Sequence, residues 1–124
     1  MANSYVGPIQ KVAEKTANEF NNCLAHTKER GLEILNTWAK SDFIDFSQST
    51  PEMICVNANL ENGYGEPDTV TTHAVFHLRL LCITLKNSRG AGVAKLTKEA
   101  ANWFYGCALA FFSQRAKNSQ ENNQ

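Results

Sequence analysis

The chain has 124 residues, a length typical of one domain, and 43% of them are hydrophobic, which is enough to close a core. Twelve basic and twelve acidic residues give a formal net charge of zero, which disfavours nucleic acid and membrane surfaces as partners. The sequence shows no apolar run of membrane-spanning length and no basic, apolar leader at its start, so we expect a cytoplasmic protein.

The first predicted element is helical and runs from Val6 to about Lys40. Its apolar residues recur every three or four positions, as on one face of a helix: Ile9, Val12, Ala13, Phe20, Leu24, Ile34, Leu35 and Trp38. Gly31 indicates either a kink or the end of a first helix. Unbroken, this helix would be about 50 Å long, more than a domain of this size can cover. A second subunit would then cover its apolar stripe, which favours a homo-oligomer, as does the low charged fraction of 19%.

Residues 42–51 predict an irregular connection, and two segments with the alternation of half-buried strands follow it. Residues 54–60 alternate apolar and polar positions, and residues 70–80 do the same after a turn-rich loop at 62–67. The two segments predict an antiparallel pair. The alternation is lost at residues 80–83, which indicates a bulge or a new buried strand. A helix over 69–86 is the competing interpretation, because Asp68 or Thr69 could cap it.

A glycine-bearing loop at 87–92 precedes a second helical stripe, which starts at Leu96-Thr97-Lys98-Glu99 and ends near Lys117. We therefore predict one α+β domain over residues 1–117, followed by a disordered polar tail over 118–124. The expected fold is a long N-terminal helix, an antiparallel sheet of two to three strands, and a C-terminal helix packed on that sheet.

The strongest candidate for a ligand site is the segment between the last predicted strand and the second helix. Gly90 and Gly92 would let backbone amides approach a ligand, and Arg89 and Lys95 add positive charge near a helix N-terminus. This combination predicts a site for a phosphate group. A plain turn with two glycines and solvent-facing basic residues is the competing interpretation.

This segment resembles the pyrophosphate loop of acyl-CoA-dependent N-acetyltransferases. The Arg-x-x-Gly-x-Ala pattern of that family falls on Arg89, Gly92 and Ala94, between a predicted strand and a predicted helix, and the likeness covers about 30 residues. The resemblance implies an acyltransferase that binds acyl-CoA, as an enzymatic alternative. In that family a further strand and the acceptor half of the domain follow the helix, whereas a polar tail follows it here. We therefore retain only the anion site that the family and this chain would share.

A second candidate is the polar row that alternates with the apolar positions of residues 70–80. Thr71, His73, His77 and Arg79 should project from the face of the sheet opposite the core, which is then either hydrated or part of an interface. We expect either Arg115 or the row of His73, His77 and Arg79 to assist the phosphate site, if necessary from a neighbouring subunit. In the helical alternative His73 and His77 lie one turn apart, but Ala74 replaces the glutamate of an HExxH zinc site.

Neither metal nor catalytic chemistry finds support in the sequence. Four cysteines stand apart in apolar stretches, without a CxxC pair, and are interpreted as reduced core residues: Cys23, Cys55, Cys82 and Cys107. Cys23 and His26 have a possible metal spacing but no further ligand beside them. The acidic residues cluster in connections, and no serine has the context of a nucleophile elbow. We therefore predict a non-enzymatic protein without a cofactor.

Two functional hypotheses follow from these patterns. The first is a homo-oligomeric binding protein that holds or sequesters a phosphate-bearing, nucleotide-like small molecule. The second is an interaction module or inhibitor of viral or phage type, which binds a protein partner through its first helix and an aromatic cluster. The interface residues expected in that second case are Phe20, Trp38, Phe43 and Phe46.

Overall fold

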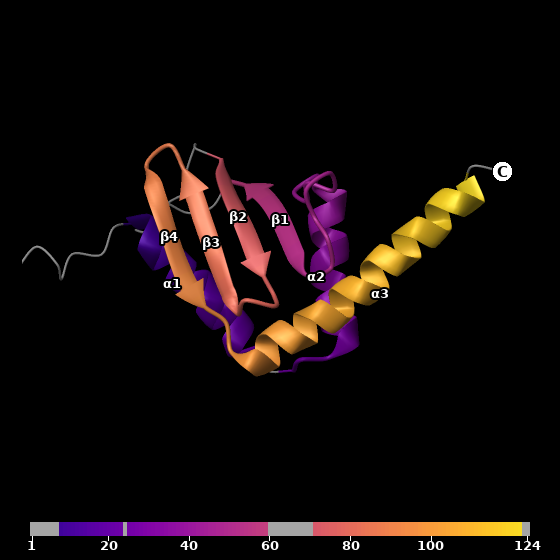
Figure 1. The fold of residues 1–124 in the computed structure, drawn as a ribbon, viewed down its shortest axis with the longest axis horizontal. Coiled ribbons are helices and arrows are strands. Elements are labelled where there is room, and N and C mark those ends of the chain that lie inside the picture. Colours follow the sequence, from indigo (N-terminus) through magenta and orange to yellow (C-terminus); the bar gives the residue numbers. More distant parts are fainter. Residues whose placement is uncertain (1–7, 24, 60–70, 123–124) are drawn as a thin grey trace, which may run out of the picture.

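The computed structural model describes residues 8–23, 25–59 and 71–122. The elements follow in the order α1 (Pro8–Asn21), α2 (Lys28–Lys40), β1 (Met53–Ala58), β2 (Thr72–His77), β3 (Cys82–Asn87), β4 (Gly90–Lys95) and α3 (Lys98–Asn122). The strands form one antiparallel sheet in the order β1-β2-β3-β4 (Figure 1). The predicted α+β fold, with helices from both ends of the chain on the sheet, is confirmed, with one strand more than expected.

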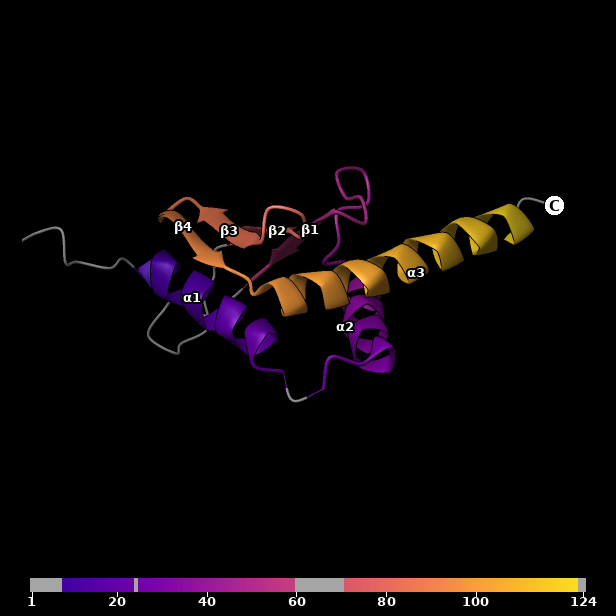
Figure 2. The same cartoon turned by 60° about the horizontal axis from the view of Figure 1, so that its bottom comes forward.

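The helices lie on one side of the sheet, as the two views in Figures 1 and 2 show. Every second residue of β2 is buried beneath them, namely Thr72, Ala74 and Phe76, whereas the residues between are only partly covered. This alternation is what a strand with one buried face requires. The core therefore lies between the sheet and the helices, and residues 72–77 are a strand rather than part of a helix.

The N-terminal helical segment is two helices, and the break between them comes before Gly31. α1 ends at Asn21, and Thr27 caps α2 by accepting a hydrogen bond from the amide of Arg30. Gly31 lies inside α2, where an added Cβ would come within 2.2 Å of the Sγ of Cys107 in α3. This glycine thus allows two helices to touch. The argument for a second subunit from one 50 Å helix is wrong, because α1 is only about 21 Å long.

The segment after β3 departs most from the sequence prediction. Residues 90–95 form strand β4, whereas a glycine loop leading into a helix was expected. Glycine is rare inside strands, so the two glycines of β4 made this strand hard to predict from the sequence. Gly92 is needed for packing, because a Cβ there would lie 2.8 Å from the Cα of Gln10 in α1. Gly92 therefore allows α1 to pack against β4, whereas we had expected it to let backbone amides approach a phosphate.

The remaining boundaries agree more closely with the sequence. The loss of alternation at residues 80–83 marks a turn followed by a new strand, β3, which is buried at alternate positions and not throughout as expected. Thr97 caps α3 by accepting a hydrogen bond from the amide of Ala100, as the expected helix start requires. α3 continues to Asn122, so that residues 118–122, predicted as part of a disordered tail, are helical. The predicted loop at 62–67 lies outside the described residues.

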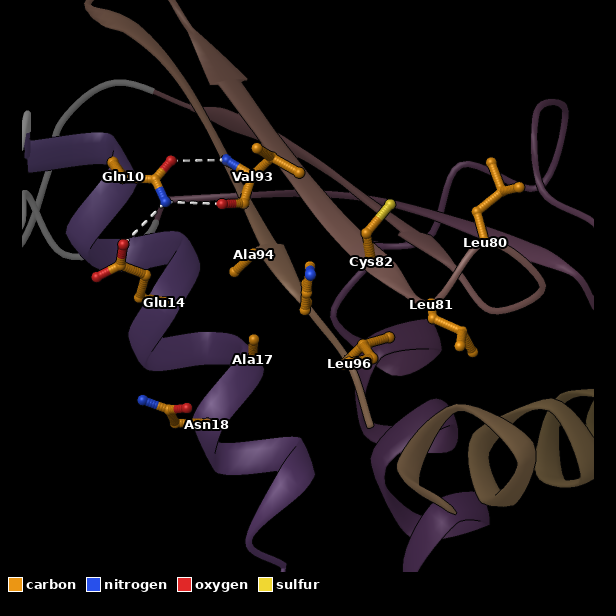
Figure 3. Close-up of a pocket in the computed structure, with 11 residues that line it drawn as sticks. Gln10, Glu14, Ala17, Asn18, Leu80, Leu81, Cys82, Val93, Ala94 and Leu96 are labelled. Atoms are coloured by element: carbon orange, nitrogen blue, oxygen red, sulfur yellow. Dashed lines mark hydrogen bonds between the residues drawn. The ribbon is translucent and has the colours of Figure 1, made fainter. Parts of the chain in front are cut away.

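Both edges of the sheet are covered, but by different means. Along β1, the amide of Asn57 donates to the carbonyl of Phe43, and the amide of Asp45 donates to the carbonyl of Cys55. Along β4, the side-chain amide of Gln10 bonds both the N–H and the C=O of Val93 (Figure 3). Open edges are where a further strand would add, so these contacts restrict such addition along β1 and β4.

Candidate functional site

The open face of the sheet is made of three rows of side chains that the strand register aligns across the four strands. The first row is Met53, His77, Cys82 and Lys95; the middle row is Cys55, Val75, Thr84 and Val93; and the third row is Asn57, His73, Lys86 and Ala91. Valine, cysteine and hydroxyl groups occupy the middle row. The ionisable nitrogens are therefore confined to the two outer rows.

In the three rows of this face, the ionisable nitrogen groups are those of histidines and lysines, and none of the residues carries a carboxylate. His73 lies directly opposite Lys86 in the third row, and His77 and Lys95 share the first row. Side chains paired across strands have Cβ atoms about 5 Å apart. Although the formal net charge of the chain is zero, this face carries the positive charges of two lysines, and the described parts of its strands contain no carboxylate.

The two histidines are positioned by hydrogen bonds to their neighbours on the face. Nδ1 of His73 lies 2.7 Å from Oδ1 of Asn57, and Nε2 of His77 lies 3.2 Å from Oγ1 of Thr84. Because the amide oxygen of Asn57 only accepts, Nδ1 of His73 carries the proton. Its Nε2 is then an acceptor in the neutral ring and a donor when the ring is protonated. His73 and Lys86 lie side by side in the third row of the open face.

Two thiols of this region have pKa values raised by burial. Burial raises the pKa of Cys82, which lies between His77 and Lys95 in the first row. Burial also raises the pKa of Cys55, an effect that its hydrogen bond to Ser49 opposes and the charge of Asp45 reinforces. A raised pKa keeps a thiol protonated at neutral pH, and the thiolate is the reactive form.

The prediction of a phosphate-binding loop directly before the C-terminal helix is wrong. The amide of Arg89 donates to Oδ1 of Asn87 within the β3–β4 turn, and Gly90 and Gly92 pair in register with Asn87 and Leu85. These backbone groups belong to a hairpin, and the helix begins only at Lys98. Without a strand–loop–helix arrangement, the acetyltransferase-like loop is absent as well.

The eight predicted ligand residues do not form one cluster. His73, His77 and Lys95 share the open face, whereas Arg89 lies in the hairpin turn at the far end of β4 from Lys95, about 20 Å along the strand. Arg79 points toward α3, with its guanidinium 5.5 Å from the ring centre of Tyr105. Arg115 is in the second half of α3, 3.6 Å above the ring of Phe46. One phosphate group could not contact all of them.

The predicted interface aromatics pack largely within the molecule. Phe20 and Trp38 lie 5.1 and 5.3 Å from the ring of Phe76, centre to centre, so their rings help to fill the core. Phe43 is partly buried against the same core, and Phe46 stacks on Phe111 at 6.2 Å. These residues therefore have a structural role, whatever contacts their exposed edges make.

Sequence reasoning missed Lys86, Asn57 and Thr84 on the open face. Lys86 was grouped with the glycine loop that follows it, and the alternation of β3 is too short to stand out between Leu80 and Asn87. Recognising the β3–β4 hairpin in the sequence would have placed Lys86 on the open face. With Ser88 and Arg89 as the turn, residues 82, 84 and 86 fall on the same face as His73 and His77.

Two further features bear on chemistry outside this face. Both ring nitrogens of His26 face oxygen acceptors, with Nε2 2.9 Å from the carbonyl of Phe20 and Nδ1 3.1 Å from Oε1 of Glu99. This histidine fastens the α1–α2 connection to α3. In the described part of the chain, no three His, Cys, Asp or Glu side chains gather closely enough to hold a metal ion.

A hollow with a volume of about 900 Å³ lies along the outer edge of β4 (Figure 3). Gln10, Glu14 and Asn18 of α1 line one wall, and the turn before β3 lines the other. Gln10 is committed there to Val93 and Glu14 through three hydrogen bonds. Cys82, Val93 and Lys95 of the open face also line this hollow, and the carboxylate of Glu14 makes it less suited to a phosphate than the rest of that face.

Comparison with protein-family models, with curated proteins and with solved structures finds no match to this chain. Within the ranges 8–23, 25–59 and 71–122, no helix is both long and apolar enough to cross a bilayer.

Proposed function

We propose that this protein is a non-enzymatic binding protein that holds a phosphate-bearing small molecule on the open face of its sheet. The observation that carries the proposal is the grouping of Lys86, Lys95, His73 and His77 on that face, without a carboxylate on the described parts of the same strands. Lysine ammonium groups donate hydrogen bonds that phosphate oxygens accept.

The spacing of the two basic rows indicates the kind of ligand. His73 and His77 are four residues apart on β2, and Ala91 and Lys95 mark the same interval on β4, which corresponds to about 13 Å. Val75, Thr84 and Val93 lie between the rows. A ligand that contacts both rows carries anionic groups at both ends and flat groups between them, as a linear dinucleotide with a phosphate at its 5′ end and at its 3′ end does.

Calorimetric titration with inorganic phosphate, ATP and a dinucleotide tests this proposal. We expect the dinucleotide to bind most tightly, and the double variant Lys86→Ala/Lys95→Ala to weaken its binding about tenfold or more, since two charge-assisted contacts are lost. Binding should also weaken as salt is added, because these charges are exposed.

The matched control is Lys98→Ala/Lys117→Ala, which removes the same charge from α3 and should leave the affinity unchanged. The half-buried Cys82 offers an independent readout, because bound ligand should slow its alkylation. The proposal fails if no phosphorylated compound binds, or if both double variants lose affinity equally.

Homo-oligomerisation remains a separate prediction. Two copies meeting through their open faces would place lysines opposite lysines, which is repulsive unless an anionic ligand lies between them. Light scattering with and without the dinucleotide measures the mass in each state. A monomer under both conditions would remove the oligomer from the proposal and leave the ligand site intact.

A further inference from the structure

A second surface, remote from the open face, lies between α2 and the second half of α3. The two helices touch where Gly31 meets Cys107, and beyond this contact they leave a groove with a volume of about 530 Å³. Figure 2 shows α2 beneath α3, on the side away from the open face of the sheet. The groove floor is apolar and consists of Leu32, Ala39, Ala110 and Phe111.

The charged residues that line this groove are all basic. Lys28 and Lys40 contribute from α2 and Arg115 from α3, and the other polar lining groups are amides. The guanidinium of Arg115 is held 3.6 Å above the ring of Phe46, a cation–π contact that limits its freedom. Glu33, an α2 carboxylate outside the lining, forms an ion pair with Arg30. An apolar floor bordered by positive charges is therefore available to a partner.

The length of the groove indicates the shape of that partner. Lys28 and Lys40 are twelve positions apart on α2, or about 18 Å, which corresponds to roughly three turns of a helix. A single phosphate group spans only a fraction of this distance. Helices that bind in grooves place apolar residues every three or four positions on the floor and polar residues along the rims.

We propose that this groove binds an acidic amphipathic helix of a protein partner. The apolar side of that helix packs on Leu32 and Phe111, and its carboxylates pair with the lysines and with Arg115. A second copy of this chain fits poorly as the occupant. The apolar side of α1 is already buried in the core, and residues 113–118 of α3 are polar, with Arg115 and Lys117 as their charged groups.

Fluorescence anisotropy with designed peptides tests this inference on the full chain. The acidic probe is a helical peptide of about 14 residues with leucines at helical spacing and glutamates beside them, and the basic probe replaces each glutamate by lysine. We expect the acidic peptide to bind at least about tenfold more tightly than the basic one, with amide NMR shifts confined to α2 and residues 107–118.

Charge reversal provides the matched variants. Lys40→Glu/Arg115→Glu should abolish binding of the acidic peptide and create binding of the basic one, whereas Lys86→Glu/Lys95→Glu on the open face should change neither. All four residues are solvent-exposed, so we expect both variants to fold, which circular dichroism checks. If the groove variant does not fold, the NMR map on the unaltered chain decides alone.

Several outcomes overturn the proposal. They are equal binding of the two peptides, shifts outside the groove, binding of neither peptide, or a groove occupied by inorganic phosphate or by a second copy of the chain. The dinucleotide titration tests the open face and the peptide titration tests the groove. A negative result at one site therefore does not contradict the proposal for the other.

Discussion

The two faces of the sheet are built from the same strands, and alternate residues give them opposite chemistry. On the covered face, Phe76 is 3% exposed, and Ile54 and Ile83 are fully buried. On the open face, the neighbouring positions hold His77, Lys86 and Lys95. A period of two is sufficient to place a core on one side and a charged surface on the other. The covered face accounts for the stability of the protein, and we propose that the open face binds a ligand.

The largest effect should come from truncating the covered face. Phe76→Ala removes a ring that contacts Phe20, Trp38 and Phe104, and should lower the free energy of unfolding by about 3–5 kcal/mol. The adjacent Val75→Ala, on the open face, should cost only about 1 kcal/mol. Urea unfolding measures both. Equal losses would contradict the division of roles between the two faces.

A smaller effect is expected where α1 packs on the covered side of β4. Gly92→Ala places a methyl group against the backbone of Ile9 and Gln10, and should cost about 1–3 kcal/mol, because backbone cannot move aside locally. Gly106→Ala is the control, since an added Cβ there meets no atom within 4 Å, and it should stabilise α3 by about 0.5–1 kcal/mol. Thermal unfolding of both variants distinguishes a packing glycine from a dispensable one.

Gln10→Ala should have a third, more local effect. It removes the two hydrogen bonds to Val93 and should cost about 1–2 kcal/mol. The amide of Val93 should then exchange with solvent faster, and the protein should self-associate more readily through the uncovered edge of β4. Gln114→Ala, whose side chain bonds only to Asn118 on the same helix, serves as the control. Unchanged exchange at Val93 would show that Gln10 does not protect this edge.

The smallest effect concerns pH. Burial raises the pKa of Cys107, which belongs to the covered side, and of Cys82 on the open face. A raised pKa means that the folded state holds the proton more tightly. The stabilisation is complete below the pKa of the unfolded thiol and is lost as the pH rises through the folded pKa.

Unfolding curves at neutral and alkaline pH therefore should show a steeper loss of stability in the natural chain than in a variant with alanine at Cys55, Cys82 and Cys107. Identical slopes would mean that the three thiols titrate alike in the folded and unfolded states.

Strong periodicity made some of this structure predictable. The apolar stripe from Leu96 to Phe111 identified α3, and the alternation around Ala74 and Phe76 identified β2 together with its open face. β4 was not predictable, because its glycines are explained by the approach of α1, which is a tertiary contact. The gap between α1 and α2 was similarly obscured by a stripe that both helices share, although Thr27 carried a capping signal.

The candidate site shows the same limit. His73 and His77 were found because they share one strand, whereas Lys86 joins them only through the β2–β3 register. Grouping Arg89 with Lys95 relied on their closeness in sequence, but an extended strand places them at opposite ends. Proximity in sequence was therefore misleading, whereas strand pairing shows which residues lie together on the face.

The central claim is that the open face binds an anionic ligand, and amide NMR during titration with a dinucleotide tests it most directly. The claim predicts shifts concentrated at His73, Thr84, Lys86 and Val93, with the covered strand positions and α2 largely unchanged. Shifts that cluster at α2 and α3, or none at a saturating concentration, would contradict it.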